Sequence, residues 1–147
     1  MKTSILSILA MLSLSAVFGP VHLMAQDAIH VTIPFNFTVG AKPFVAGEYT
    51  VKQVTPAILA IQSADGRAQM AIIGQPGEPS DTPGVAKLTF HRYGDRYFLS
   101  RVAEDDKGWE LRKSTAEKEL LAKRAQPTTL SIIASVASVA SVASNTK

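Results

Sequence analysis

The chain has 147 residues, enough for one folded domain, and 46% of them are apolar. Its 15 lysines and arginines exceed its 12 acidic residues by only three, and this small, scattered surplus does not indicate a nucleic-acid partner. It has no cysteine, which excludes disulfides, thiol chemistry and a lipid anchor on a cysteine.

Residues 1–25 have the pattern of a signal peptide. Lys2 gives a positive start, residues 5–18 form an apolar run interrupted by serines, and Ala25 is a small residue at the cleavage point. We expect cleavage after Ala25, which removes Lys2 and lowers the formal charge from +3 to +2. The mature protein is then exported, periplasmic or extracellular, with no stable membrane span. The alternative is that the leader is retained as an anchor.

Alternating apolar residues predict strands at the start of the mature chain. Residues 29–33 and 35–39 form one bent strand or two strands divided at Pro34, because proline cannot donate to a strand ladder. Turn residues follow, and Gly47 leads into a further strand over 49–54.

Asp65-Gly66 predicts a hairpin between strands that span 58–63 and 68–73. In this register Leu59 faces Ile72, and apolar residues occupy the same face of both strands. The opposite face is also largely apolar, so we expect both faces of this hairpin to be covered.

Residues 74–85 are rich in glycine and proline and predict a long irregular loop. Such a loop is either a plain mobile connection or a lid over a ligand.

Gly94-Asp95 predicts a second hairpin, joining a strand that ends at Tyr93 to one that begins at Arg96. The register places Phe90 opposite Leu99 and Arg92 opposite Tyr97. Residues 109–111 then form a short strand, with Trp109 packed on the edge of the core.

The C-terminal part contains one helix and a low-complexity tail. Ser114 and Glu117 form a capping box, and Pro127 ends the helix, which predicts a helix over 114–126 on the surface of the sheet or free of it. Residues 127–147 are rich in alanine, serine and valine, with a three-residue repeat that fits neither a helical face nor strand alternation. We expect this tail to be disordered or loosely helical.

Together these elements predict a mainly β protein. Residues 26–113 form a single β-sandwich or open barrel of about seven antiparallel strands in hairpins, followed by one short C-terminal helix.

Catalytic, metal and cofactor motifs are absent from the sequence, so we expect no cofactor and no metal. His30 and His91 have no metal-ligand spacing, and the adjacent acidic residues 104–106 form a solvated turn, with a weak calcium site as the alternative. A triad of His91, Asp95 and Ser100 is compatible with the spacing but has no positive support.

The strongest candidate for recognition is the basic and aromatic set on the 87–103 hairpin. Arginine and tyrosine together are common in binding surfaces. The alternative is that arginine stacks on tyrosine across the strands and only stiffens the hairpin. The candidate binding residues are His91, Arg92, Tyr93, Arg96, Tyr97 and Arg101.

Several segments resemble a family of small exported proteins of acidobacteria. These segments are IPFNFTVG, VAGEYTVKQV, LAIQSADGRA, KLTFHRYGDRYFLSRV and ELRKSTAEKEL, and they cover about residues 29–122. The resemblance implies export and a shared β-rich fold, and implies no activity. The Ala-Ser-Val tail departs from the polar, charged ending of that family. VAGEYTV is also similar to a turn of transthyretin-like and collagen-adhesin B-type sandwich modules.

Three functions are compatible with this pattern. The first is a non-catalytic envelope or extracellular domain that binds a protein, a glycan or a small molecule, or associates structurally. The second is a carrier that holds a small apolar ligand within the β-sheet core. The third is a hydrolase that uses His91.

Overall fold

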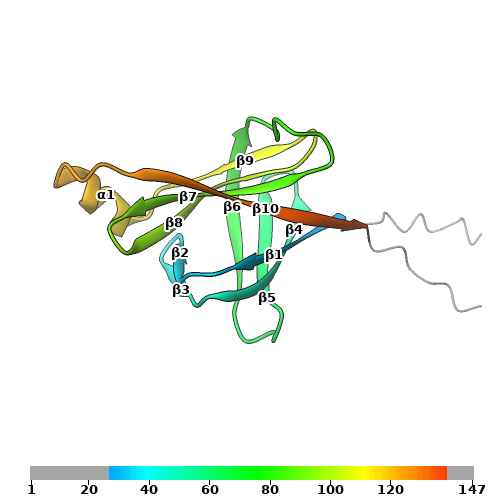
Figure 1. Ribbon diagram of the computed structural model, residues 1–147, viewed down its shortest axis with the longest axis horizontal. Coiled ribbons are helices and arrows are strands. Elements are labelled where there is room, and N and C mark those ends of the chain that lie inside the picture. The colour runs from blue at the N-terminus through cyan, green and yellow to red at the C-terminus, as the bar shows by residue number, and fades with distance from the viewer. Residues whose placement is uncertain (1–26, 139–147) are drawn as a thin grey trace, which may run out of the picture.

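The structure, a computed structural model, describes residues 27–138, which form ten strands and one helix (Figure 1). In chain order these are β1 (Asp27–Ile33), β2 (Phe37–Val39), β3 (Lys42–Phe44), β4 (Gly47–Thr55), β5 (Ile58–Ser63), β6 (Gln69–Gly77), β7 (Ala86–Tyr93), β8 (Arg96–Ala103), β9 (Gly108–Leu111), α1 (Thr115–Ala122) and β10 (Thr128–Ser138). Within this range no helix has the length and hydropathy needed to cross a membrane. The expected signal peptide, residues 1–25, lies outside the described residues.

Eight of the strands close into an antiparallel barrel. Their order is β8-β7-β10-β1-β4-β5-β6-β9, and β9 pairs back to β8. The hairpin of β2 and β3 is attached to β8 by one parallel pair, Thr38 and Phe98, and lies between the two layers of the barrel (Figure 1). The prediction of a mainly β fold with strands in hairpins and one C-terminal helix is confirmed, and the barrel is closed.

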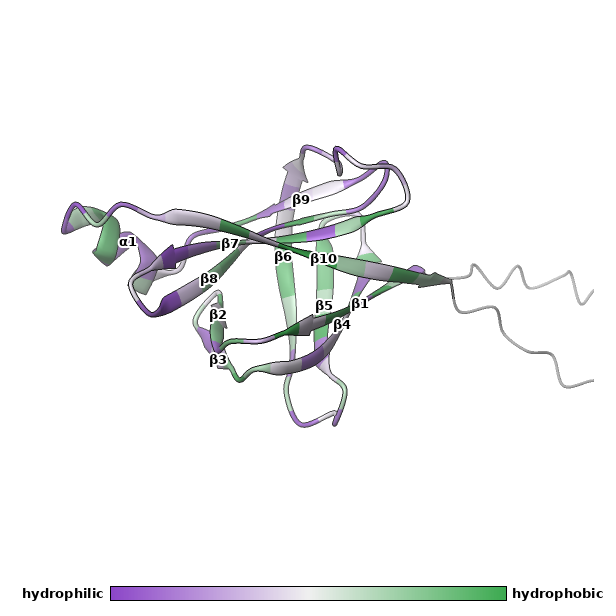
Figure 2. Cartoon of the chain, in the orientation of Figure 1, coloured by the Kyte–Doolittle hydropathy of each residue, from purple (hydrophilic) through white to green (hydrophobic). Residues whose placement is uncertain are grey.

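The core of the barrel comes from one face of each strand. On β1 the side chains of Ile29, Val31 and Ile33 are buried, whereas His30 and Thr32 between them are exposed. The inward-facing side chains of the other strands join them in one contiguous cluster. Apolar residues lie along β5, β6 and β10, whereas the tip of the β7–β8 hairpin is hydrophilic (Figure 2). Full burial of each large side chain stabilises the fold by about 1.5–3 kcal/mol.

Both predicted hairpins have the expected register. Leu59 pairs with Ile72, and His91 pairs with Phe98. The turns need glycine because Gly66 and Gly94 have φ of 71° and 60°, values that other residues rarely adopt.

The outer face of the β5–β6 hairpin is open to solvent, so the prediction that both faces are covered is wrong. Ile73 is 65% exposed there. A barrel has only one interior, and apolar residues beyond those that fill it remain outside.

The segment predicted as an irregular loop over 74–85 is partly a strand. β6 continues to Gly77 because Gly74 to Gly77 pair with β9. Pro76 is tolerated since the pairing of β6 with β5 ends at Ile73, which leaves one edge of β6 free. The predicted strand around Trp109 is confirmed as β9, and the Trp109 indole is buried and donates to the Pro56 carbonyl at 3.1 Å.

Helix α1 begins at the predicted cap, Ser114, but ends earlier than the predicted Gln126. Arg124 adopts a left-handed conformation with φ of 61°. Its N–H donates to the Leu121 carbonyl, and the N–H of Ala125 donates to the Leu120 carbonyl, which is the pattern that terminates many helices. The helix lies against the outer face of β7, as one of the two predicted placements.

The prediction of a disordered or loosely helical tail from residue 127 is wrong for the part that the structure describes. β10 pairs with β7 over Thr128–Ala134 and with β1 over Ser135–Ser138, so the domain does not end at residue 113. The first seven residues of β10 alternate in a period of two, with Leu130 and Ile132 opposite Phe90 and Leu88. The three-residue repeat begins only afterwards, and residues 139–147 lie outside the described residues.

Candidate functional site

The six candidate binding residues do not share one surface. Arg92 and Tyr97 pair across β7 and β8, where the Arg92 guanidinium lies 5.5 Å from the centre of the Tyr97 ring. Tyr97 in turn stacks on Phe35, with ring centres 4.0 Å apart. Arg96 lies over the Phe98 ring at 5.2 Å. The predicted stacking of an arginine on a tyrosine across this hairpin is therefore present.

His91 and Tyr93 lie on the outer face of β7, beneath α1. Both contact the carboxylate of Glu117, which is 2% exposed: His91 Nδ1 is 2.7 Å from Oε1, and the Tyr93 hydroxyl donates to the same atom at 3.3 Å. Burial raises the pKa of the Tyr93 phenol, and the charge and hydrogen bond of Glu117 raise it further.

Glu117 was identified from the sequence only as part of a helix cap. Its backbone N–H does donate to Ser114 Oγ at 3.1 Å, as the capping box predicts. Its carboxylate points to β7, and no local pattern signals this long-range contact.

The proposed triad is not assembled. The carboxylate that orients His91 belongs to Glu117, and Ser100 Oγ donates to the Thr89 carbonyl at 3.0 Å. An imidazole oriented by a carboxylate is one half of a general-base arrangement, and in the part of the chain described here no serine or threonine hydroxyl is hydrogen-bonded to it.

The acidic turn after β8 contacts the loop before β7. Asp105 Oδ1 accepts a hydrogen bond from the Gly84 N–H at 2.7 Å and so fixes the preceding loop. Between residues 27 and 138 no group of three or more His, Asp or Glu side chains is arranged to hold a metal ion.

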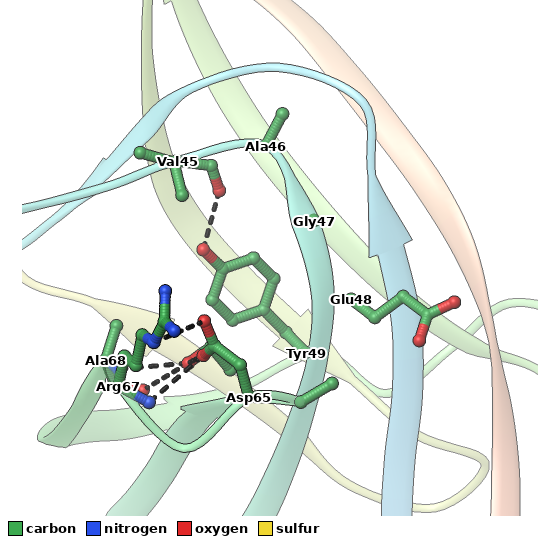
Figure 3. Close-up of a pocket in the computed structure, with 10 residues that line it drawn as sticks. Val45, Ala46, Gly47, Glu48, Tyr49, Asp65, Arg67 and Ala68 are labelled. Atoms are coloured by element: carbon green, nitrogen blue, oxygen red, sulfur yellow. Dashed lines mark hydrogen bonds and ion pairs between the residues drawn. The ribbon is translucent and has the colours of Figure 1, made fainter.

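A cleft lies at one end of the barrel, between the turn 45–49 and the loop 63–68; we call it the rim cleft (Figure 3). Its volume is about 440 Å³, which is within the range of sites for small ligands. Val45 and three alanines contribute apolar lining. None of its residues was among the sequence candidates, because the sequence showed them only as turn residues and as the ends of strands.

Hydrogen bonds fix both walls of the rim cleft. On one side the Tyr49 hydroxyl donates to the Val45 carbonyl at 2.6 Å (Figure 3). The Ala46 N–H donates to Asn36 Oδ1 at 2.9 Å. The Ala64 N–H then joins the two walls by donating to the Glu48 carbonyl at 2.9 Å. The cleft is therefore preformed.

Asp65 supplies a fixed negative charge at this cleft. Its carboxylate accepts from Ser63 Oγ at 2.5 Å and from the Arg67 N–H at 3.0 Å, and these bonds hold its pKa below the ordinary value. Burial, and secondly the charge of Asp65, raise the pKa of the Tyr49 phenol. Arg67 Nε lies 3.7 Å from Asp65 Oδ2, and the Glu48 side chain points away from Asp65 (Figure 3), so the Asp65 carboxylate is the negative charge that faces the cleft.

The interior of the barrel is filled by side chains. Leu59, Ile61, Leu88, Phe90 and Val102 are at most 1% exposed and belong to one contiguous cluster. An apolar ligand in the core would have to displace these side chains.

The chain was also compared with known proteins. No protein-family model, no curated protein and no solved structure matches it, so the resemblance to the acidobacterial family stays a prediction.

Proposed function

We propose that the protein is an exported, non-catalytic binding domain that takes its ligand in the rim cleft. The observation that carries the proposal is a preformed cleft of about 440 Å³ with walls fixed by Tyr49, Ala46 and Ala64. A site whose shape exists before binding loses little conformational entropy when the ligand enters. Export is supported by the leader, since cleavage after Ala25 leaves a single residue before β1.

The lining favours a ligand with a small apolar body and a positively charged end. Val45 and the alanines provide apolar contact, and the Asp65 carboxylate attracts a cation. An apolar side chain of a peptide next to a basic group has this chemistry. The carrier and hydrolase alternatives rank lower because the core is filled and because, among the described residues, no serine or threonine hydroxyl is hydrogen-bonded to His91.

Three probes with the same hydrocarbon chain test the proposal: hexylammonium, hexanol and hexanoate. In nitrogen-15 NMR titrations at pH 7, we expect hexylammonium to shift the backbone amides of 45–49 and 63–68 most strongly, hexanol less, and hexanoate least. Ala46→Trp fills the cleft and should abolish these shifts. Ala122→Trp, an exposed substitution on α1, is the matched control.

Two results would refute the proposal. One is that none of the probes shifts the amides of the rim cleft. The other is that the shifts persist unchanged in Ala46→Trp.

A further inference from the structure

A second polar groove lies at the other end of β6, under the loop that follows Gly77; we call it the lid groove. Its floor is the outer face of β8, β7 and β10. Arg101, Thr89 and Ser131 lie side by side across these three strands, and Thr89 Oγ1 is 3.3 Å from Ser131 Oγ. Lys87 lies two residues along β7 from Thr89, on the same face. The groove has a volume of about 260 Å³.

Two carboxylates of the loop neutralise the two cations of the floor. Glu78 Oε2 is 3.3 Å from Arg101 Nη2, which also donates to the Glu78 carbonyl at 2.7 Å. Asp81 Oδ1 accepts from Lys87 Nζ at 2.5 Å.

The partners of these ion pairs differ in exposure. The side chains of Lys87 and Arg101 are 26% and 27% exposed, whereas those of Asp81 and Glu78 are 77% and 87% exposed. Ion pairs with one partner this exposed add little net stability, so an incoming anion can replace the carboxylate. Arg101 Nε is buried and has no hydrogen-bond partner, so the present contacts leave part of its donor capacity unused.

Two contacts fix the backbone of the loop, whereas its acidic side chains are exposed and can be displaced from their ion pairs. The Ser80 N–H donates to the Glu104 carbonyl at 2.7 Å. Glu78 lies so close to β9 that a Cβ on Gly108 would come within 1.9 Å of the Glu78 carbonyl oxygen. The loop therefore keeps its place while the carboxylates exchange.

We propose that the lid groove binds a carboxylate-bearing sugar, such as a uronate unit of a polysaccharide, in exchange for the side chains of Glu78 and Asp81. Arg101 and Lys87 take the carboxylate, in the place that the protein's own carboxylates occupy. Thr89 and Ser131 offer hydroxyls to the hydroxyls of the sugar ring. This site is separate from the rim cleft and does not depend on the proposal made for it.

The charge of the groove favours a single carboxylate over a dianion. Glu110 lies opposite Arg101 on β9. When Glu78 and Asp81 are displaced, the groove has a net charge of +1, from the positive charges of Lys87 and Arg101 and the negative charge of Glu110. A phosphate dianion would meet more repulsion from Glu110 than a carboxylate does.

Nitrogen-15 NMR titrations with methyl glucuronide and methyl glucoside test this site. We expect the glucuronide to shift the amides of 78–81, 87–89 and 101, and the neutral glucoside to leave them in place. Glu78→Gln with Asp81→Asn removes the competing carboxylates and should tighten glucuronide binding by about threefold. Both positions are exposed, so the double variant should fold as the parent does.

Two controls separate this site from general effects. Lys87→Met should abolish the shifts, and so should about 1 M NaCl, which screens charges beyond roughly 3 Å. Asp65→Asn, in the rim cleft, should leave glucuronide binding unchanged.

The proposal is overturned by any of three results. These are equal shifts with the neutral glucoside, tighter binding of glucose 6-phosphate than of the glucuronide, or unchanged affinity in the double variant without Glu78 and Asp81 carboxylates.

Discussion

Among residues 27–138, Glu117 is the only charged side chain that is buried, and it decides how α1 is held. A buried carboxylate is costly unless it is hydrogen-bonded. His91 and Tyr93 supply its partners from β7. This contact joins the helix to the barrel although its apolar stripe is thin.

Replacing Glu117 with alanine leaves the Tyr93 hydroxyl and the His91 ring without their partner. We expect the free energy of unfolding to fall by about 1–3 kcal/mol, as is typical when buried polar groups lose a hydrogen bond. Urea denaturation measures this loss. Glu119→Ala, an exposed position on the same helix, is the control and should change little. Equal effects of the two substitutions would contradict the role given to Glu117.

The raised pKa values of Tyr49 and Tyr93 predict instability in alkali. Burial is the main cause in both, with Asp65 and Glu117 adding to it respectively, so the folded protein holds these phenolic protons more tightly than the unfolded chain. The two protonated tyrosines therefore contribute fully to the free energy of unfolding below the ordinary tyrosine pKa of about 10. This contribution is lost as the pH rises through the folded-state pKa. Urea denaturation between neutral pH and pH 11 measures the decline.

The double variant Tyr49→Phe, Tyr93→Phe isolates this effect. It should be less stable at neutral pH, because the hydrogen bonds to Val45 and Glu117 are gone. Its stability should then fall less steeply in alkali than that of the parent. An identical slope in the two proteins would show that these tyrosines are not the cause.

At the scale of elements, β10 decides whether the barrel closes. It pairs with β7 in its first part and with β1 in its second, and so joins the two edges that would otherwise be open. Open edges of this kind promote association between chains.

Two neighbouring isoleucines of β10 provide a matched test. Ile132 faces inward opposite Leu88 and packs on the core, whereas Ile133 faces outward and is 72% exposed. We expect Ile132→Ala to lower the free energy of unfolding by about 1–2 kcal/mol, since the side chain is only partly buried. Ile133→Ala should stay within about 0.5 kcal/mol of the parent. Thermal or urea denaturation distinguishes the two, and a disordered tail would make both substitutions neutral.

The hairpins were predictable because their signals are local. Asp65-Gly66 and Gly94-Asp95 determine the positions of the two turns. The alternation of apolar and polar residues determines which face of each strand is buried and how the strands pair. β10 was missed because the repeat after Ala134 concealed the alternation before it. The continuation of β6 through Pro76 was missed because it depends on β9, which follows β6 by about 30 residues in the chain.

The sites were less predictable than the strands. The candidate residues of the β7–β8 hairpin share a sequence segment, but successive side chains of a strand point to opposite faces. Because of that alternation His91 and Arg92 lie on opposite faces of β7. Arg101, on β8, contacts Glu78 of the loop instead of the other candidates. The rim cleft joins the turn 45–49 to the loop 63–68, and the carboxylate of Glu117 crosses from a helix to a strand. Neither follows from local sequence.

At the scale of the molecule, the barrel consists of two layers joined by two strands that change partners. β6 pairs with β5 and then with β9, while β10 pairs with β7 and then with β1 (Figure 1). Strands that pass from one layer to the other form the corners of such barrels. The rim cleft adjoins the start of β6 and the lid groove adjoins its end. One continuous strand thus holds the two proposed sites apart.

The chain forms one closed barrel that includes Thr128–Ser138, and this closure keeps the walls of both proposed sites in place. Hydrogen–deuterium exchange of the backbone amides tests it directly. We predict that the hydrogen-bonded amides of β10 exchange as slowly as those of β7 and β1, its two neighbours. Exchange of the β10 amides at the rate of an unstructured chain, with β7 and β1 still protected, would contradict closure of the barrel by β10.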